Sequence, residues 1–556
     1  MRKPLLIAVV LLLAACAGQG ERDIVVVSVV GTNDVHGELT PRDDRGGLVT
    51  LSGYVSALRA ARADDGAVLL VDAGDMWQGT LASNLSEGRT VVEAYNALGY
   101  AAAAVGNHEF DFGPLGTKAI PESVGDDPQG ALRQRATEAD FPLLAANLVD
   151  EKTGRTVAWE NVRASTMVTL GGIDIGIVGV VTADALQTTI AANTAGLRVA
   201  PLAEAVVSEA NRLRADGAEL VIVLAHAGGR CTAFEDPQDL SSCNPNSEVI
   251  RLARAIPEGL VDHIVGGHVH QGVAHEINGI AVTASYSSTR AFSRVDFVLD
   301  ADAGTIVEKR IMPPQPNRPV AFYEGEPAEP MSKIVALAER ARELAARQQA
   351  EKIGVYLDTP MTLRPGPESE LGNLMTDAVR EYTGADIAIH NVRGGIRAEL
   401  PAGELTYGSV YRMFPFDNRI AIIELSGAEL RSVIAEQVHN VGRRAGFSGM
   451  RVFIECNDDT MSIRMLDPDG REIGHDDRQR VVVNDFLLMG GDDVLQPVIP
   501  PEGFAIPTDT ELVRDVLLQW FDGRGGSLDA SMFYDETRPR WNLPAELPAA
   551  CAYSSM

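Results

Sequence analysis

The sequence has 556 residues, enough for more than one domain. Its 77 acidic and 48 basic residues give a formal net charge of −29, which argues against binding a nucleic-acid polymer through a basic surface. Five cysteines are too few for a disulfide-built scaffold. The sequence also lacks the apolar run of about 20 residues that would predict a membrane-spanning helix. Any phosphate chemistry in so acidic a chain would need a local positive centre.

The first residues predict export. Arg2 and Lys3 precede the apolar run Leu5–Ala15, which is too short to span a bilayer. The small residues before Cys16 resemble the processing site of bacterial lipoproteins. That resemblance implies removal of residues 1–15 and a protein held at the periplasmic or outer face of the cell envelope by lipid on Cys16 alone. The alternative is an ordinary signal peptide that is cleaved nearby.

Four cysteines remain after this processing. Cys231 and Cys243 bracket a short polar segment and could close it as a disulfide, because an exported protein meets an oxidising environment. Cys456 and Cys551 are the second possible pair. The alternative is four free thiols.

Residues 24–310 are predicted to alternate between strands and helices, which indicates an α/β domain. The predicted helices include Val49–Ala63 and Leu202–Ala215. The strands are apolar on both faces, which suits a sheet covered on both sides. These strands are Ile24–Val30, Val68–Val71, Ile175–Val181, Leu220–Leu224 and Ile264–Val265.

A change in composition predicts a domain boundary over residues 311–353. Met312–Pro330 is rich in proline, which is typical of a linker. Met331–Glu351 is predicted as an amphipathic helix, because apolar residues recur there at helical spacing. They are Ile334, Leu337, Ala341 and Leu344. A second domain is predicted over residues 354–542, followed by a loose tail over 543–556.

Polar residues stand where the apolar strands of the first domain end. Five such motifs follow one another, and together they are hard to obtain by chance, although each alone is usually a turn. They contain Asp34 and His36; Asp72 and Asp75; Asn107, His108, Glu109 and Asp111; His226; and His268 and His270. Carboxylate, imidazole and amide groups are ligands of divalent metals, and strand ends meet at one edge of a sheet. The pattern therefore predicts a metal centre.

The order D-x-H, G-D, G-N-H-E, A-H and G-G-H-x-H resembles the calcineurin-like two-metal phosphoesterases. Further motifs, L-G-N-L, G-G-I-R, P-F and G-G-D, resemble the exported 5′-nucleotidase and UDP-sugar hydrolase branch. The resemblance covers essentially the whole mature chain. It implies a β-sandwich flanked by helices, a connecting helix and a C-terminal α/β substrate-binding domain.

The resemblance also implies two divalent metal ions, zinc or manganese. Asp34, His36, Asp75 and His270 would hold one ion, where some members have Gln in place of His270. Asp75, Asn107, His226 and His268 would hold the other, so that Asp75 bridges the two. Asp72 and Glu109 would be structural.

His108 and Asp111 resemble the catalytic pair of the family. The implied reaction is phosphate ester hydrolysis by a water that the two ions activate. Asp111 would orient the imidazole, and His108 would stabilise the charge that develops on the transferred group.

The second domain would bind the nucleoside. Phe416 and Phe486 match the two aromatic residues that sandwich the base, and Asp492 matches the acidic residue that binds the ribose. Asn391 and Arg397 match further substrate-binding positions, with one residue more between them than usual. Where the family often has another arginine this chain has Pro367, so that Arg364 or Arg393 would have to replace it.

The implied activity is metal-dependent hydrolysis of nucleotide phosphate esters, with nucleoside monophosphates, UDP-sugars and cyclic nucleotides as candidate substrates. One alternative is a hydrolase of another ester, similar to the thiosulfohydrolases of the same fold. Another is a non-catalytic envelope lipoprotein that binds nucleotides. The sequence does not indicate the oligomeric state.

Overall fold

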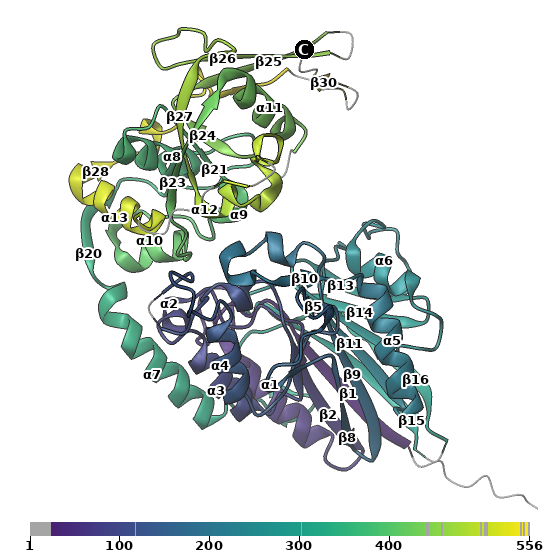
Figure 1. The fold of residues 1–556 in the computed structure, drawn as a ribbon. Coiled ribbons are helices and arrows are strands. Elements are labelled where there is room, and N and C mark those ends of the chain that lie inside the picture. The colour runs from purple at the N-terminus through teal and green to yellow at the C-terminus, as the bar shows by residue number, and fades with distance from the viewer. Residues whose placement is uncertain are drawn as a thin grey trace, which may run out of the picture.

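The computed structural model describes residues 24–556 except 117, 302, 441–443, 458–459, 501–502, 505–509, 545–547, 549–550 and 554–556. The predicted signal segment and Cys16 lie outside the described residues. Within the described part of the chain, no helix is long and apolar enough to cross a membrane. The described residues form two bodies joined by one long helix (Figure 1).

The first body contains two sheets that pack face to face (Figure 1). The first has the order β16 (Thr305–Ile311), β15 (Ala291–Asp300), β1 (Ile24–Thr32), β2 (Gly66–Asp72), β3 (Ala102–Ala104), β4 (Leu143–Leu144) and β7 (Val162–Arg163). The second has the order β13 (Gly272–Ile277), β14 (Ile280–Ser285), β12 (His263–Gly266), β11 (Leu220–His226), β9 (Ile173–Val181) and β8 (Ser165–Leu170).

Helices cover both outer faces of this sandwich. The first sheet packs against α1 (Gly47–Ala61), α3 (Arg89–Leu98) and α4 (Gly130–Glu138), and the second against α5 (Leu202–Ala215) and α6 (Glu248–Ala255). Each sheet therefore buries both of its faces, which explains why the strands are apolar throughout. The sandwich with flanking helices is the architecture that the family resemblance implied.

The strands that carry the motifs run parallel to one another. In the first sheet β1 pairs with β2, so that Thr32 lies beside Asp72 at their carboxyl ends. In the second sheet β11 pairs in parallel with β9 and β12. The polar residues that follow β1, β2, β3, β11 and β12 are thereby brought to one end of the sandwich.

The connecting helix α7 (Ser332–Gln349) belongs to the core of the first body. Ile334, Leu337 and Ala341 are buried against α1 and α3. The expectation for Leu344 was wrong, since 71% of its surface is exposed and the next residue, Ala345, is buried instead. Near the end of the helix, Ala345 packs against Leu81 of the first body and Tyr411 of the second.

The second body is mixed α/β, as the family resemblance implied. Its sheets are β22 (Gly403–Thr406), β20 (Lys352–Leu357) and β28 (Gly526–Leu528); β23 (Ile420–Ser426), β27 (Arg478–Asn484), β21 (Ile387–His390) and β24 (Gly446–Ser448); and β29 (Trp541–Asn542), β25 (Arg451–Asn457), β26 (Thr460–Leu466) and β30 (Ala552–Tyr553). Its helices are α8 (Glu370–Thr383), α9 (Val392–Gly395), α10 (Tyr407–Met413), α11 (Gly427–Val438), α12 (Asp485–Leu488) and α13 (Val513–Arg524).

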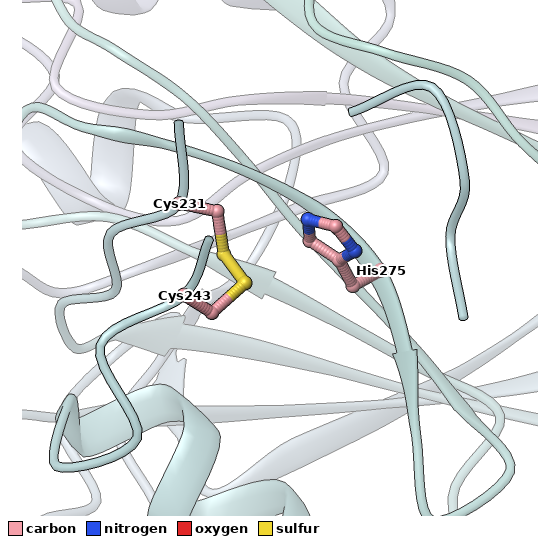
Figure 2. A group of neighbouring side chains, drawn as sticks. All are labelled: Cys231, Cys243 and His275. Carbon is pink, nitrogen blue, oxygen red and sulfur yellow. A yellow bond between two sulfur atoms is a disulfide. The ribbon is translucent and has the colours of Figure 1, made fainter. Parts of the chain in front are cut away.

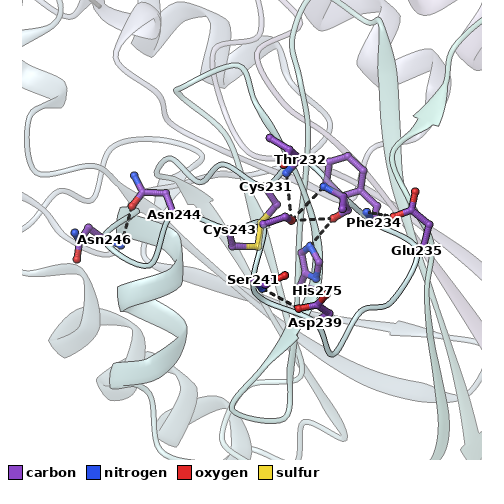
Figure 3. Close-up of a disulfide and its surroundings, with 12 residues drawn as sticks. Cys231, Thr232, Phe234, Glu235, Asp239, Ser241, Cys243, Asn244, Asn246 and His275 are labelled. Atoms are coloured by element: carbon purple, nitrogen blue, oxygen red, sulfur yellow. Dashed lines mark hydrogen bonds between the residues drawn. A yellow bond between two sulfur atoms is a disulfide. The ribbon is translucent and has the colours of Figure 1, made fainter. Parts of the chain in front are cut away.

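The structure contains both disulfide pairs that were considered. Cys231 is bonded to Cys243 beside His275, and this group has the composition of a metal site, but the two sulfurs bind each other (Figure 2). The enclosed segment is held further by His275, whose Nε2 donates to the carbonyl of Ala233, and by Asp239, which accepts from the backbone of Ser241 (Figure 3).

The second disulfide ties down the end of the chain, where a loose tail was expected. Cys551 is bonded to Cys456, and β30 directly after it pairs with β26. The two cysteines are 95 residues apart, against 12 for Cys231 and Cys243.

We expect Cys551→Ala to destabilise its body by more than Cys231→Ala destabilises the other. Closing a loop of about 100 residues removes roughly 4.7 kcal/mol of chain entropy from the unfolded state, and a loop of about 15 residues roughly 3 kcal/mol. Calorimetry of the two variants would show a larger fall in Tm for Cys551→Ala. Equal falls would contradict the loop-length argument.

Candidate functional site

The strand-end residues converge in one cluster, buried except for the partly exposed His36, His268 and His270, at the end of the sandwich. Asp34 and His36 follow β1, Asp75 follows β2, Asn107 and His108 follow β3, His226 ends β11, and His268 and His270 follow β12. Five of them have positive φ angles between 50° and 75°, a conformation that is unfavourable for side chains other than glycine. They are Asp34, His36, Asp75, His268 and His270. The backbone of the cluster is therefore strained at these five positions.

One group of donor atoms consists of Asp34, His36 and His270. The Nε2 atoms of His36 and His270 are 3.0 Å apart, and His270 Nε2 is 3.4 Å from Asp34 Oδ1. His36 Nδ1 donates to the carbonyl of Gln78, which leaves the Nε2 lone pair for the cluster. Burial lowers the pKa of His36 to about 3, and a neutral imidazole is the form that binds metals.

A second group lies beside it. Asp75 Oδ2 is 3.2 Å from His226 Nε2, and the amide oxygen of Asn107 is 3.0 Å from the same nitrogen and 3.1 Å from His268 Nδ1. His226 Nδ1 donates to the carbonyl of Ala73, so its Nε2 also faces the cluster. The backbone N–H of His268 donates to Asp34 and thereby joins the two groups.

These donors fit divalent cations. Ligand atoms of Asp34, His36 and His270 lie within 4.8 Å of one another, as do those of Asp34, Asp75 and His226. Burial alone would lower the pKa of His226, but the Asp75 carboxylate raises it to about 10. The same charge attracts a metal ion. Asp34 therefore belongs to both of these three-residue sets. The family resemblance instead gives the bridging role to Asp75, and that role stays a prediction.

His108 and Asp111 form a hydrogen-bonded pair at the edge of the cluster. His108 Nδ1 donates to Asp111 Oδ2 over 2.6 Å, and the hydroxyl of Thr189 donates to the other oxygen over 2.7 Å. Burial alone would lower the pKa of His108, but the charges of Asp111 and then Asp75 raise it. His108 Nε2 lies 4.0 Å from Asp75 Oδ2, so the imidazole is beside the donors without being among them.

Three further residues hold the cluster in shape. Glu109 accepts from the backbone N–H groups of Asp75, Met76 and Gly106. Asn33 donates to Asp34 over 2.7 Å. A Cβ at Gly106 would lie 2.2 Å from Asp75 Oδ1, so only glycine allows this close approach. The sequence singled out Glu109 as structural but gave no signal for Asn33 or Thr189.

The second body completes a cavity of about 270 Å³ over the cluster. Its walls include Asp75, Asn107, His108, Asp111, His268 and His270 from the first body, and Asn391, Arg393, Arg397, Phe416, Phe486 and Asp492 from the second. All five predicted substrate-binding residues therefore line the same space as His108 and Asp111. Phe416 and His108 have ring centroids 6.0 Å apart.

Specific contacts position the residues of the second body. Asn391 donates to Asp492 over 2.7 Å. The guanidinium of Arg397 lies over the Phe416 ring at 5.2 Å and is 3.2 Å from His108 Nε2. The Phe486 ring packs on Gly491, where a Cβ would lie 2.4 Å from it. Aromatic, polar and cationic groups thus surround one cavity.

The two arginines near the unmatched family position differ in placement. Arg393 lines the cavity and donates to the carbonyl of Arg364. Arg364 instead pairs with Glu370 at 2.7 Å and lies over the ring of Tyr534. Arg393 is therefore the one that can contact a molecule in the cavity.

Direct contacts between the two bodies surround the cavity. Gln78 donates to the carbonyl of Pro415 over 3.1 Å, and Asn84 donates to the hydroxyl of Tyr411 over 2.7 Å.

Comparison with known proteins agrees with this geometry. Residues 27–272 match the calcineurin-like phosphoesterase family, and residues 350–498 match the 5′-nucleotidase C-terminal domain. The chain is 27% identical to cell wall protein Lmo0130 of Listeria monocytogenes over 85% of its own length and 64% of that protein, so it spans less than two thirds of this relative.

It is 25% identical to a 5′-nucleotidase of Vibrio parahaemolyticus, over 92% of this chain and 93% of that one. Among solved structures, the 5′-nucleotidase precursor of Thermus thermophilus has a TM-score of 0.71 at 22% identity, covering 94% of this chain and all of that one. The chain therefore belongs to the proteins that join a calcineurin-like phosphoesterase domain to a 5′-nucleotidase C-terminal domain.

Proposed function

We propose that this protein hydrolyses the 5′-phosphate ester of nucleotides, with nucleoside monophosphates as the preferred substrates. The observation that carries the proposal is that one cavity is lined by members of the predicted metal centre, the His108–Asp111 pair and the two phenylalanines. We call the predicted metal ligands, which are the strand-end residues Asp34, His36, Asp75, Asn107, His226, His268 and His270, the donor cluster. A base between Phe416 and Phe486 would stack, and Asp492 would accept from the ribose hydroxyls. The phosphate would then lie against the donor cluster.

The donors of the cluster would hold two divalent ions, zinc or manganese, with Asp75 between them. Such ions activate water and neutralise phosphate oxygens. His108 and Arg397 would place positive charge and N–H donors beside the transferred phosphate, and Asp111 would keep the imidazole oriented. Arg397 therefore contributes to the positive centre that an acidic protein needs for an anionic substrate.

The direct test is phosphate release from AMP, UDP-glucose, a 2′,3′-cyclic nucleotide, thiosulfate esters and 4-nitrophenyl phosphate, before and after chelation. We expect AMP to be hydrolysed and chelation to abolish turnover, with recovery on adding zinc or manganese. Turnover that survives chelation would contradict the metal-dependent mechanism. Turnover of sulfur esters alone would make the protein a different hydrolase, and nucleotide binding without turnover a binding protein.

The phenylalanines should set the preference for nucleotides. We expect Phe416→Ala and Phe486→Ala each to lower kcat/KM for AMP about tenfold or more, because stacking contributes roughly 1–3 kcal/mol per base. Hydrolysis of 4-nitrophenyl phosphate should change little. Phe453→Ala is a matched control, because Phe453 lies on β25 away from the cavity. Equal losses on both substrates would refute the stacking role.

We also propose that the protein works at the cell envelope, tethered through lipid on Cys16. The amino-terminal pattern and the Listeria relative, which is named a cell wall protein, support this location.

A further inference from the structure

The loop that follows β9 in the second sheet contacts residues that follow β3 in the first sheet. We call residues 182–194 the β9 loop, and its Thr188 and Thr189 line the cavity. The carbonyl of Thr188 accepts from the side-chain N–H of Asn107 over 3.0 Å. The hydroxyl of Thr189 donates to Asp111 Oδ1 over 2.7 Å. The β9 loop therefore holds a predicted metal ligand and one member of the catalytic pair at the same time.

Thr189 completes the hydrogen bonding of the Asp111 carboxylate. Asp111 Oδ2 accepts from His108 Nδ1 over 2.6 Å, and Oδ1 accepts from Thr189, which is 4% exposed. Among the described residues, these are the two side chains that donate to this carboxylate. Rotation about the Cβ–Cγ bond of an aspartate is soft, so one hydrogen bond leaves the plane of the carboxylate free to turn. A second donor at the other oxygen fixes that plane.

The β9 loop is itself anchored to the turn that carries the catalytic pair. Asn193 is fully buried, and its side-chain N–H group donates to the carbonyls of Phe110 and Ala119, each over 2.9 Å. Phe110 directly precedes Asp111 in the chain. Thr189 therefore extends from a segment whose position is fixed relative to the backbone of the pair, and its hydroxyl can hold the carboxylate in one place.

We propose that Thr189 is a positioning residue for the reaction, because its hydroxyl fixes the Asp111 carboxylate and that carboxylate holds the His108 imidazole in one orientation. This inference rests on the proposed function. A displacement of about 1 Å in the groups around a reacting centre can lower the rate by about 100-fold. The residues that would hold base and sugar belong to the second body, so loss of this hydroxyl should lower kcat and leave KM for AMP nearly unchanged.

Two variants of Thr189 separate the hydroxyl from the methyl group. Thr189→Val keeps the shape of the side chain and removes the hydroxyl, whereas Thr189→Ser keeps the hydroxyl and removes the methyl group. We expect Thr189→Val to lower kcat for AMP about 10- to 100-fold, the range that corresponds to loss of a hydrogen bond to a charged group. Bound metal should stay at the wild-type level, and Thr189→Ser should keep most of the activity. An impaired serine variant beside an active valine variant would make Thr189 a packing residue and overturn the proposal.

Thr169→Val is the matched control. The hydroxyl of Thr169 donates to Asp174 Oδ1 over 2.6 Å, so this variant also removes a hydrogen bond from threonine to a carboxylate. Thr169 lies on β8 and Asp174 near the start of β9, whereas Thr189 follows the other end of β9. The control variant should keep the wild-type kcat. Equal falls in kcat for Thr169→Val and Thr189→Val would show general destabilisation and refute the positioning role.

A double-mutant cycle tests whether Thr189 acts through Asp111. In the Asp111→Ala background the hydroxyl has no carboxylate to fix, so adding Thr189→Val should lower kcat little further. Losses that multiply as if the two residues were independent would overturn the proposal.

A measurement without turnover separates this inference from the proposed function. The proton between His108 Nδ1 and Asp111 should give a low-field proton NMR signal in the purified protein without substrate, and His108→Ala identifies the signal by removing it. Thr189→Val should shift or broaden this signal, and Thr189→Ser should preserve it. If AMP is not hydrolysed but the signal depends on the hydroxyl, the proposed function fails and the positioning of the pair by Thr189 stands. If AMP is hydrolysed and Thr189→Val keeps the wild-type kcat, the proposed function stands and the positioning role fails.

Discussion

Replacing His108 with alanine should lower kcat for AMP by about 10²–10⁴-fold, the range for a positioned side chain that assists proton transfer or charge stabilisation. His108 is held by Asp111 at 2.6 Å, and its Nε2 lies 3.2 Å from the guanidinium of Arg397. It is beside the donor atoms but is not one of them. Metal content should therefore stay close to that of the wild type.

Two measurements decide this prediction. The first is turnover, and the second is the amount of bound metal, determined by atomic absorption after dialysis. Asp111→Asn should lose less activity than His108→Ala, because the imidazole remains while its orientation weakens. Loss of metal in His108→Ala would make His108 a ligand, and full activity would remove it from the mechanism.

Asp75→Asn should nearly abolish both metal binding and turnover. Asp75 is buried, and its carboxylate lies 3.2 Å from His226 and accepts from the backbone of His108. Removing a group that supports a ligand typically costs about 10–100-fold in metal affinity, and removing a ligand that two ions share should cost more. Excess metal should restore turnover only in part.

Asp72→Asn is the matched control, because it removes a buried carboxylate three residues away that faces other partners. Asp72 accepts from the hydroxyls of Thr32 and Tyr95, and burial raises its pKa to about 7. Its variant should keep both ions and most activity. If Asp75→Asn and Asp72→Asn lose metal equally, the loss reflects general destabilisation and Asp75 is not a ligand.

Much of the fold and of the metal centre was predictable, because each part left a local mark in the sequence. The apolar strands β1, β2, β9 and β11 were found where they were expected, and their polar ends meet because parallel strands share an edge. Phe416, Phe486 and Asp492 were matched through the family resemblance, on short motifs with glycine or proline beside them, and all three line the cavity.

The features that the sequence did not predict depend on contacts between segments that are far apart in the chain. Thr189 holds Asp111 across 78 residues, and nothing in its surroundings marks it. Arg342 on α7 and Arg412 on α10 line one hollow whose walls come from both bodies, so their proximity depends on how the bodies pack. Leu344 followed the helical spacing and is nevertheless exposed, because the buried face of α7 continues through Ala345 instead.

Because the cavity is divided between two bodies, the predicted metal ligands and the predicted base- and sugar-binding residues lie in separate parts of the chain. Every proposed metal ligand lies within residues 34–270, and every residue proposed to contact base or sugar lies within 391–492. Substitutions among the residues proposed to contact base or sugar can change which molecule is cleaved while the proposed metal ligands stay unchanged. A lineage could thus acquire new substrates by altering one wall of the cavity, without ever passing through an inactive ancestor.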